Sequence, residues 1–196
     1  MLILERVCVV LLWTLAATES VAAEPAVPGP AVELFTGRDL DGWVNVNGAI
    51  DTWSVRDGSL VCGGKPSGFL RTAAMYENYV LEWEWRHAAP GGNSGVFLHA
   101  DALPQVGAPY PRSIEIQLLD GDHGSIFGIR RAAIVPLTNP DLKGGTPRAR
   151  PTENRCLPAG QWNRYVLTSK DGTLELAVNG RVVTRAADCS QRKGYF

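Results

Sequence analysis

Two tight-turn dipeptides near the end of the sequence constrain the fold more than any other feature. Asp171-Gly172 and Asn179-Gly180 separate three short runs in which apolar residues alternate, at 165–169, 173–178 and 181–184. Such dipeptides favour two-residue turns between antiparallel strands, because the central residues of these turns have positive φ. We therefore expect a three-stranded antiparallel meander in this part of the chain.

The rest of the chain shows more short strands and turns. Asp57-Gly58 predicts another hairpin, between 52–55 and 59–62. Outside the first residues, no window has apolar residues at the i, i+3, i+4, i+7 spacing of a helix. The 21 glycines and 13 prolines agree with many turns, and 196 residues suffice for one domain with a sizeable core. The sequence predicts an all-β sandwich of two antiparallel sheets.

The charge balance indicates the kind of partner. The chain has 19 Lys and Arg against 20 Asp and Glu, a formal net charge of -1. Nucleic-acid-binding proteins usually carry a clustered basic excess, so no nucleic-acid partner is expected. The six tryptophans supply aromatic surface that can stack on a ring-shaped ligand. These features favour a protein that binds a neutral carbohydrate.

The first residues are typical of an export signal. An uncharged apolar run, 7–17, follows Arg6, and the small residues 21–23 suit cleavage before Glu24. The run is about half the roughly 20 residues of a membrane-spanning helix, so we interpret 1–23 as a signal peptide and expect no integral membrane domain. The protein is then periplasmic or extracellular; the alternative is an uncleaved anchor. The proline-rich residues 24–32 predict an extended linker.

The cysteines allow little cross-linking in the mature chain. Cys8 leaves with the predicted signal, so that Cys62, Cys156 and Cys189 remain and can form at most one intramolecular disulfide. Their spacing matches no zinc motif. Whether any two of them pair stays open at this point.

Alternation along three strands separates a buried face from a polar face. In 79–87 the aromatic residues Trp83 and Trp85 share one side, because strand side chains alternate with period two. The segments 93–100 and 113–119 divide in the same way. If these strands belong to one sheet, their other sides form one polar patch, composed of Glu82, Glu84, Arg86, Asn93, Phe97, His99, Glu115 and Gln117.

Such a patch has two interpretations. Antiparallel sheets commonly leave one face to water, and alternating charges are then a solvated face. The composition favours a binding site, because carboxylates, an arginine, amides and a histidine bind hydroxyl groups and transfer protons, whereas solvated strands favour Thr, Lys and Ser. An aromatic ring at Phe97 would also gain nothing from facing water.

Eight segments from Glu33 onward form an ordered pattern. They are ELFTGRDLDGW (33–43), TWSVRDGSLVCGG (52–64), GFLRT (68–72), YVLEWEWR (79–86), GGNSGVFLH (91–99), IEIQLLD (114–120), PAGQWNRYVLT (158–168) and LELAVNGRVV (174–183). Together they resemble the 3-keto-disaccharide hydrolase domain family. The resemblance implies a concanavalin A-like jelly roll over 33–196.

Two departures from the family pattern stand out. The family pattern continues past 194–196 into a last strand, so the domain is expected to be C-terminally truncated, with an unpaired edge prone to aggregation. The segment 136–155 is longer and more irregular than a compact loop needs. It is either a lid or binding loop, or a disordered insertion.

The resemblance implies a substrate and a reaction. The substrate is a 3-keto-glycoside or 3-keto-disaccharide, made by a sugar 3-dehydrogenase that acts earlier. A ketone at C3 acidifies the hydrogen at C2, so a base can remove it, the C1 oxygen can leave by elimination, and water can then add. This chemistry needs a base, hydrogen-bond donors at the enolate oxygen and an acid for the leaving group.

Site residues follow from the patch and the implied chemistry. Glu115 is the expected base, because partial burial in an apolar strand would raise its pKa toward the working pH. Arg86 is the expected substrate clamp, with Glu84 as its orienting partner or a second acid or base. His123, in a glycine-rich loop, and His99 compete for acid/base roles or could join Glu115 around a divalent cation. Substrate-binding residues are expected to be Asn93, Phe97, His99 and Gln117.

Three alternatives remain open. A jelly roll of this kind also serves as a non-catalytic carbohydrate-binding module, since fold does not imply function. A conventional glycosidase would use two carboxylates, with Glu84 and Glu115 as the candidates. A structural or interaction domain is the third. The motif tryptophans Trp43, Trp53 and Trp162 are interpreted mainly as core residues, one of which could stack on a sugar.

Overall fold

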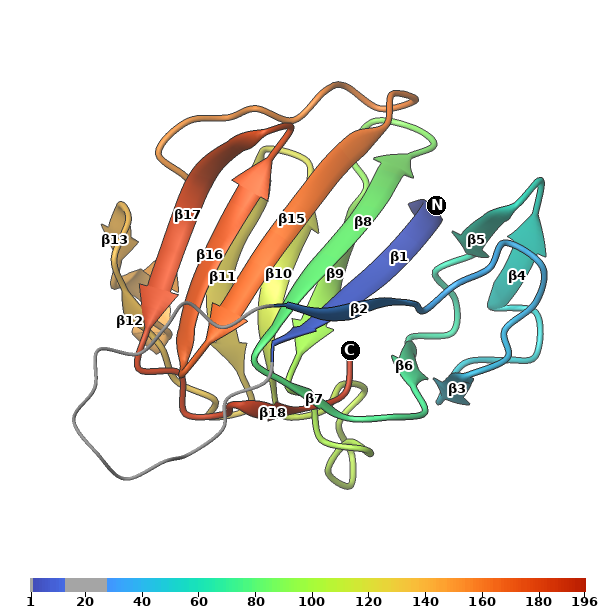
Figure 1. Cartoon of the computed structure of the whole chain (residues 1–196), viewed down its shortest axis with the longest axis horizontal. Helices are drawn as coiled ribbons and strands as arrows, with labels where there is room; N and C mark the ends of the chain where they lie inside the picture. Colours follow the sequence, from blue (N-terminus) through green and yellow to red (C-terminus); the bar gives the residue numbers. More distant parts are fainter. Residues whose placement is uncertain (1, 13–27) are drawn as a thin grey trace.

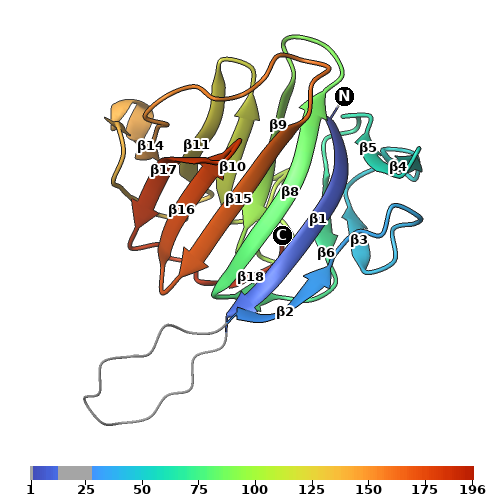
Figure 2. The ribbon, with the colours of Figure 1, turned by 45° about the horizontal axis from the view of Figure 1, so that its top comes forward.

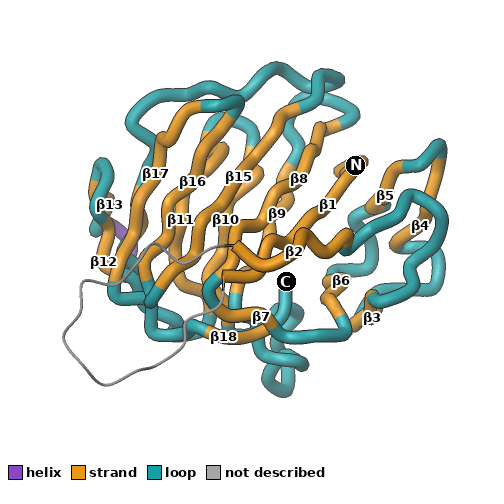
Figure 3. Tube along the Cα trace, in the orientation of Figure 1, coloured by secondary structure: helices purple, strands orange, loops and turns teal. Residues whose placement is uncertain are grey.

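The computed structural model describes residues 2–12 and 28–196, with the side chains of 29–196. Figure 3 shows strands joined by turns throughout this part of the chain, with one short 3-10 helix, η1 (Lys143–Gly145). The predicted all-β class is confirmed. Figure 2 shows two sheets packed face to face, the second behind the first.

The strands divide between two large antiparallel sheets. The first sheet holds β1 (Leu2–Leu12), β2 (Pro28–Glu33), β4 (Trp53–Arg56), β5 (Ser59–Cys62), β8 (Tyr79–His87), β12 (Val135–Pro136), β15 (Asn163–Lys170), β16 (Thr173–Val178) and β17 (Arg181–Ala187). The second holds β9 (Asn93–Leu98), β10 (Ser113–Leu119), β11 (Asp122–Ile129), β13 (Pro140–Asp141) and β14 (Arg148–Ala149). Their orders are β12-β17-β16-β15-β8-β1-β5-β4, with β2 beside β1, and β13-β14-β11-β10-β9.

Two small strand pairs flank the sandwich. One joins β3 (Trp43–Val46) to β6 (Phe69–Thr72), and the other joins β7 (Tyr76–Glu77) to β18 (Lys193–Gly194). Figure 1 shows β3 and β6 beside the β4–β5 hairpin, at one side of the first sheet. At the end of the chain, Phe196 stacks on Tyr76 with ring centroids 4.8 Å apart.

The predicted meander is confirmed as β15, β16 and β17. Its turns have the positive φ that the dipeptides require, with 49° at Asp171 and 48° at Asn179. The earlier Asp57-Gly58 turn joins β4 to β5 in the predicted hairpin, and φ is 50° at Asp57. The local turn chemistry therefore fixes where each of these three hairpins begins.

The core lies between the two sheets. Trp83, Leu81 and Tyr165 face inward from the first sheet, and Ile114 and Ile116 face inward from the second. Burying each of these side chains contributes about 1.5–3 kcal/mol. The alternation predicted for β8 and β10 is confirmed, because every second residue of each strand belongs to this core.

The predicted signal peptide overlaps a described strand. Residues 2–12 form β1, whose backbone pairs with β8 on one side and with β5 on the other. Residues 13–23 lie outside the described residues, and export stays a prediction. The last part of the predicted linker is strand β2, which pairs with β1. In the described part of the chain, no helix has the length and apolarity to span a membrane.

The three cysteines whose side chains are described are free thiols. Cys189 is buried, and Cys62 and Cys156 are half-buried. The Cys156 sulfur lies 3.1 Å from the Tyr165 hydroxyl, so the thiol takes part in a hydrogen bond. Burial raises the pKa of Cys156 to about 11, which keeps the thiol protonated and unreactive at neutral pH.

Candidate active site

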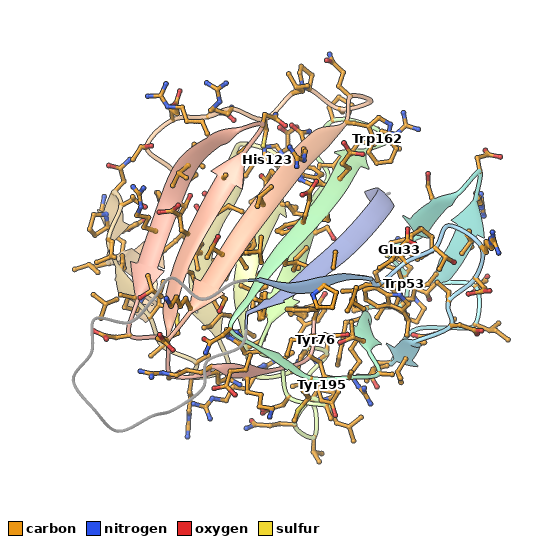
Figure 4. All side chains as sticks on the ribbon, in the orientation of Figure 1. Glu33, Trp53, Tyr76, His123, Trp162 and Tyr195 are labelled. Carbon is orange, nitrogen blue, oxygen red and sulfur yellow. The ribbon has the colours of Figure 1, made fainter. Side chains whose placement is uncertain are left out.

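A cleft of about 370 Å³ runs along β9, the edge strand of the second sheet. The hairpin β4–β5 and the segment 64–70 form its other side. Figure 4 shows Trp53 on the side of this hairpin that faces the body of the sandwich. Among the described residues that line the cleft, Glu115 is the one charged side chain. The cleft is therefore suited to a neutral ligand.

Glu115 lies on the outer face of the second sheet, where β10 passes beside β9. Its neighbours on β10 face the core, and in register it lies opposite Phe97. A Cβ at Gly95 would overlap the Glu115 carboxylate, so the carboxylate occupies the space that this glycine leaves free. Burial raises the pKa of Glu115 to about 7, although the Arg148 charge acts in the opposite direction. The predicted rise in pKa is confirmed.

Two amides accompany this carboxylate. Gln117 lines the cleft from β10, and its Oε1 accepts a hydrogen bond of 3.1 Å from the Leu118 backbone N–H. This bond uses the amide oxygen and leaves the Nε2 donors for a ligand. Asn93 lies at the start of β9 and is exposed at the cleft. The structure thus brings Asn93, Gln117 and Glu115 together, as predicted.

Aromatic rings line the side of the cleft next to Glu115. Phe97 packs edge-on against Phe69, with centroids 6.2 Å apart, and against Tyr110, with centroids 5.7 Å apart. Trp53 joins them, and its Nε1 is buried without a hydrogen-bond partner among the described residues. Trp53 is therefore a cleft residue with a free donor, rather than only a core residue.

The prediction of one pooled polar patch is wrong for β8. Glu82, Glu84 and Arg86 lie on the outer face of the first sheet, opposite in direction to the face that carries Glu115. Glu82 accepts a 2.6 Å hydrogen bond from Arg164 Nε on β15. The prediction assumed one sheet, but β8 belongs to the first sheet and β10 to the second, so their polar faces point away from each other.

Arg86 and Glu84 therefore do not meet Glu115. Arg86 donates to the Gly160 backbone oxygen at 3.2 Å and stacks over Trp162, 4.6 Å from the ring centroid. This contact places Trp162 on the same outer surface. Glu84 and Glu115 point outward from two different packed sheets, and such sheets lie about 10 Å apart. They are therefore too far apart to be the two carboxylates of a conventional glycosidase.

His99 lies inside the sandwich instead of on the polar face. Its φ of 51° ends the alternation of β9 and turns the side chain toward the first sheet. The ring nitrogen Nε2 is 3.1 Å from the Tyr79 hydroxyl and 3.3 Å from the Ser169 hydroxyl. Burial lowers the pKa of His99 to about 4, so it is neutral at ordinary pH. His99 is a structural residue.

His123 lies in a second pocket, of about 240 Å³, which Glu115 does not line. Its ring is 5.2 Å from Trp85 and 5.8 Å from His87, measured between centroids. Figure 4 shows His123 toward the same end of the sandwich as Trp162. Burial lowers the pKa of His123, and the nearby His87 lowers it further. The prediction that His123 shares a site with Glu115 is therefore wrong, because the two residues line separate pockets.

The structure does not bring together the three residues that could have surrounded a divalent cation. Glu115, His99 and His123 have separate surroundings, and the described residues contain no group of three His, Cys, Asp or Glu side chains that could hold a metal ion.

The segment 136–155 is ordered and lies away from the cleft. It forms β13, η1 and β14 at the far edge of the second sheet, and none of its described residues lines the cleft. Arg150 binds Asp141 at 2.7 Å and Asp122 at 2.9 Å, and Arg148 pairs with Asp122 and stacks on Phe127. Its charges therefore anchor the segment to β11.

The sequence does not predict two aromatic residues of the cleft, Phe69 on β6 and Tyr110 in the loop between β9 and β10. The packing of their rings against Phe97 depends on contacts between distant segments. Trp53 belongs to the segment 52–64, one of the eight that resemble the family pattern, and this position indicates that it could line the site. Trp53 also precedes the loop 63–68, and loops held by a rigid scaffold often carry binding residues.

Solved structures share this fold. A "putative glycosyl hydrolase" from Parabacteroides distasonis is 24% identical, with a TM-score of 0.60 and 84% of each chain covered. A second from the same organism is 18% identical, with a TM-score of 0.57, 82% of this chain and 86% of that chain covered. The carbohydrate-binding module CBM66 from Bacillus subtilis is 15% identical, with a TM-score of 0.52 and coverage of 79% and 84%. At these identities the likeness concerns the fold.

Sequence comparison identifies the family. A comparison with curated proteins finds no match. The sequence profile of the 3-keto-alpha-glucoside-1,2-lyase-like domain family matches residues 30–195, which include every described lining residue of the cleft except Phe196. This match confirms the resemblance seen in the sequence. Because the profile covers most of the chain, the protein belongs to the 3-keto-alpha-glucoside-1,2-lyase-like domain family.

Proposed function

We propose that this protein cleaves the glycosidic bond of neutral 3-keto-glycosides by elimination across C1 and C2, followed by hydration. The observation that carries the proposal is the Glu115 carboxyl in the cleft, whose pKa of about 7 suits a base at neutral pH. The family description, a 1,2-lyase-like domain for 3-keto-alpha-glucosides, supports the same bond.

In the first step Glu115 takes the proton from C2. The electron pair of the C–H bond forms the enolate of the C3 ketone, and the Gln117 amide N–H groups, which the bond to Leu118 leaves free, would donate to the enolate oxygen. The enolate then collapses to a C1=C2 double bond, and the C1–O bond breaks with its electron pair on the leaving oxygen. The sugar is now an enone.

In the second step water completes the hydrolysis. The leaving oxygen takes a proton from water, and the resulting hydroxide adds to C1 of the enone. Electrons return to the C3 oxygen, and protonated Glu115 gives its proton back to C2. One carboxyl group therefore serves both steps, which agrees with the single charged side chain among the described residues of the cleft.

The substrate requires an earlier oxidation. A C3 hydroxyl does not acidify the C2 hydrogen, so a sugar 3-dehydrogenase must supply the ketone. The predicted export signal would place this protein outside the cytoplasm, and we propose the same compartment for the supply of 3-keto sugar.

The test compares a 3-keto-glycoside with its unoxidised parent, with wild type and Glu115→Gln side by side. Release of the aglycone from the keto sugar alone, lost in Glu115→Gln, supports the proposal. In heavy water, the carboxyl proton of Glu115 exchanges with solvent deuterons between the two steps, so the sugar product should also carry deuterium at C2. Cleavage of the parent, or cleavage by Glu115→Gln at the wild-type rate, would refute the assigned base.

A carbohydrate-binding module is the second candidate. It is favoured by the position of Arg86 and His123 outside the cleft, which leaves one group for proton transfer among the described lining residues. Binding of the unoxidised parent sugar by wild type, with no release from either sugar, would support this alternative.

A further inference from the structure

The side of the cleft next to Glu115 carries three aromatic rings in contact with one another. Phe69, Phe97 and Tyr110 form a continuous row of edge-to-face rings, with centroid distances of 6.2 Å and 5.7 Å. Tyr110 ends this row and remains 36% exposed. An exposed ring at the end of a packed row offers a surface for another ring to cover.

This row lies next to the reacting atoms of the proposed function. Phe97 is the residue opposite Glu115 on the adjacent strand, and neighbouring strands are about 4.8 Å apart. A sugar with C2 at the Glu115 carboxylate has C1 one bond away, since C1 and C2 are neighbours in the ring. The substituent on C1 can therefore reach the row that begins at Phe97.

The size and charge of the cleft limit what that substituent can be. A volume of about 370 Å³ is near the small end of the roughly 300–1,000 Å³ of ligand pockets, which suits one sugar ring with one further ring. Among the described lining residues, no Lys, Arg or His is present to bind a charged group. A long oligosaccharide or an acidic aglycone does not fit these features.

We propose that the cleft selects 3-keto-glycosides with an aromatic aglycone, and that the Phe97–Tyr110 pair binds the aglycone ring. The inference rests on the proposed function for the placement of the sugar. The residue that binds the aglycone differs from the residue that does the chemistry, because Tyr110 contributes a ring face and Glu115 acts as the base. A sugar aglycone can stack through its C–H face, but it would also bury hydroxyl groups against this apolar row and so gain less than an aromatic ring does.

Benzyl and methyl 3-keto-glucosides test the inference, because both release simple alcohols that are poor leaving groups. Their dissociation constants are measured by calorimetry with Glu115→Gln, which holds the substrates without turnover. The benzyl compound is expected to bind about tenfold more tightly, the gain typical of one good aromatic pair. Tyr110→Ala in the same background should remove this ratio, and Tyr110→Phe, which keeps the ring, should retain it.

Trp162→Ala provides the matched control. It removes an aromatic ring from the outer surface of the first sheet, beside Arg86, and should leave the ratio unchanged. Equal affinity for the benzyl and methyl compounds, or a ratio unaffected by Tyr110→Ala, would overturn the inference. A retained ratio together with no turnover by the wild-type protein would instead refute the proposed function and leave aromatic recognition in place.

Discussion

Replacing Glu115 with glutamine should stabilise the protein at alkaline pH while it removes activity. The fold raises the pKa of Glu115 from 4.5 to about 7, chiefly because burial penalises the charged form. The unfolded chain releases this proton near pH 4.5, whereas the folded protein keeps it until about pH 7. Between these values the unfolded state binds fewer protons, so stability falls as pH rises.

The size of this effect follows from the shift. Each pKa unit corresponds to about 1.4 kcal/mol, so the shift of Glu115 costs about 3 kcal/mol of stability once the pH is above 7. Glutamine has the same shape and no charge to bury. Glu115→Gln should therefore match wild type near pH 4 and exceed it by about 3 kcal/mol at pH 8.

Urea denaturation at pH 4.5 and pH 8, followed by tryptophan fluorescence, measures both free energies of unfolding. Glu82→Gln is the matched control, because Glu82 is also a strand glutamate but pairs with Arg164 at the surface. It should change stability by less than about 1 kcal/mol at either pH. A Glu115→Gln variant that is no more stable than wild type at pH 8 would refute the account of a buried, unpaired carboxylate.

The same variant links stability to catalysis. Wild-type kcat/KM for a 3-keto-glycoside should rise with pH to a plateau with a midpoint near 7, since the base must be ionised. Glu115→Gln should lower kcat/KM by about 10²–10⁴-fold. Loss of activity in a variant that is more stable than wild type would exclude unfolding as the cause.

Three further predictions follow from the placement of residues. Gly95→Ala should lower kcat/KM by roughly 10²-fold, because its Cβ would displace the Glu115 carboxylate, with native circular dichroism as the control. Arg86→Ala should change kcat/KM by less than about twofold, as it lies on the other sheet; a larger loss measured in the same assay would contradict that placement. Deleting residues 1–23 removes the eight residue pairs between β1 and β8. Because each hydrogen bond contributes roughly 0.5–1.5 kcal/mol, the deletion should clearly lower the urea midpoint of unfolding. An unchanged midpoint would show that β1 contributes little to stability.

Local sequence patterns predicted the strands and turns well. The features that they did not predict, such as which sheet a strand joins, depend on long-range contacts. The turn at Asp171-Gly172 and the alternation of β8 and β10 depend on neighbouring residues, so the sequence alone sufficed for them. The assignment of β8 and β10 to different sheets depends on strand order, which no local pattern contains. The inward turn of His99 depends on one residue with positive φ, for which histidine gives only a weak signal.

The two outer faces differ in how their charges are balanced, and this difference distinguishes a solvated face from a site. On the first sheet, Glu82 and Glu175 each pair with an arginine of the adjacent strand, Arg164 and Arg185, at 2.6 Å and 2.7 Å. Such exposed pairs neutralise each other, contribute about 0–1 kcal/mol and remain available to water.

On the second sheet the acidic and basic groups are distributed differently. Arg148 is paired with Asp122, so Glu115 is left without an ion-pair partner among the described residues. A carboxylate in that position costs stability in its ionised form, and a stable fold gains nothing by keeping it. This loss of stability is explained if the Glu115 carboxylate is a base, because the desolvation that destabilises its ionised form also raises its pKa to about 7. Alternation identified both polar faces, but the missing counter-charge identifies the one on which a proton can be taken.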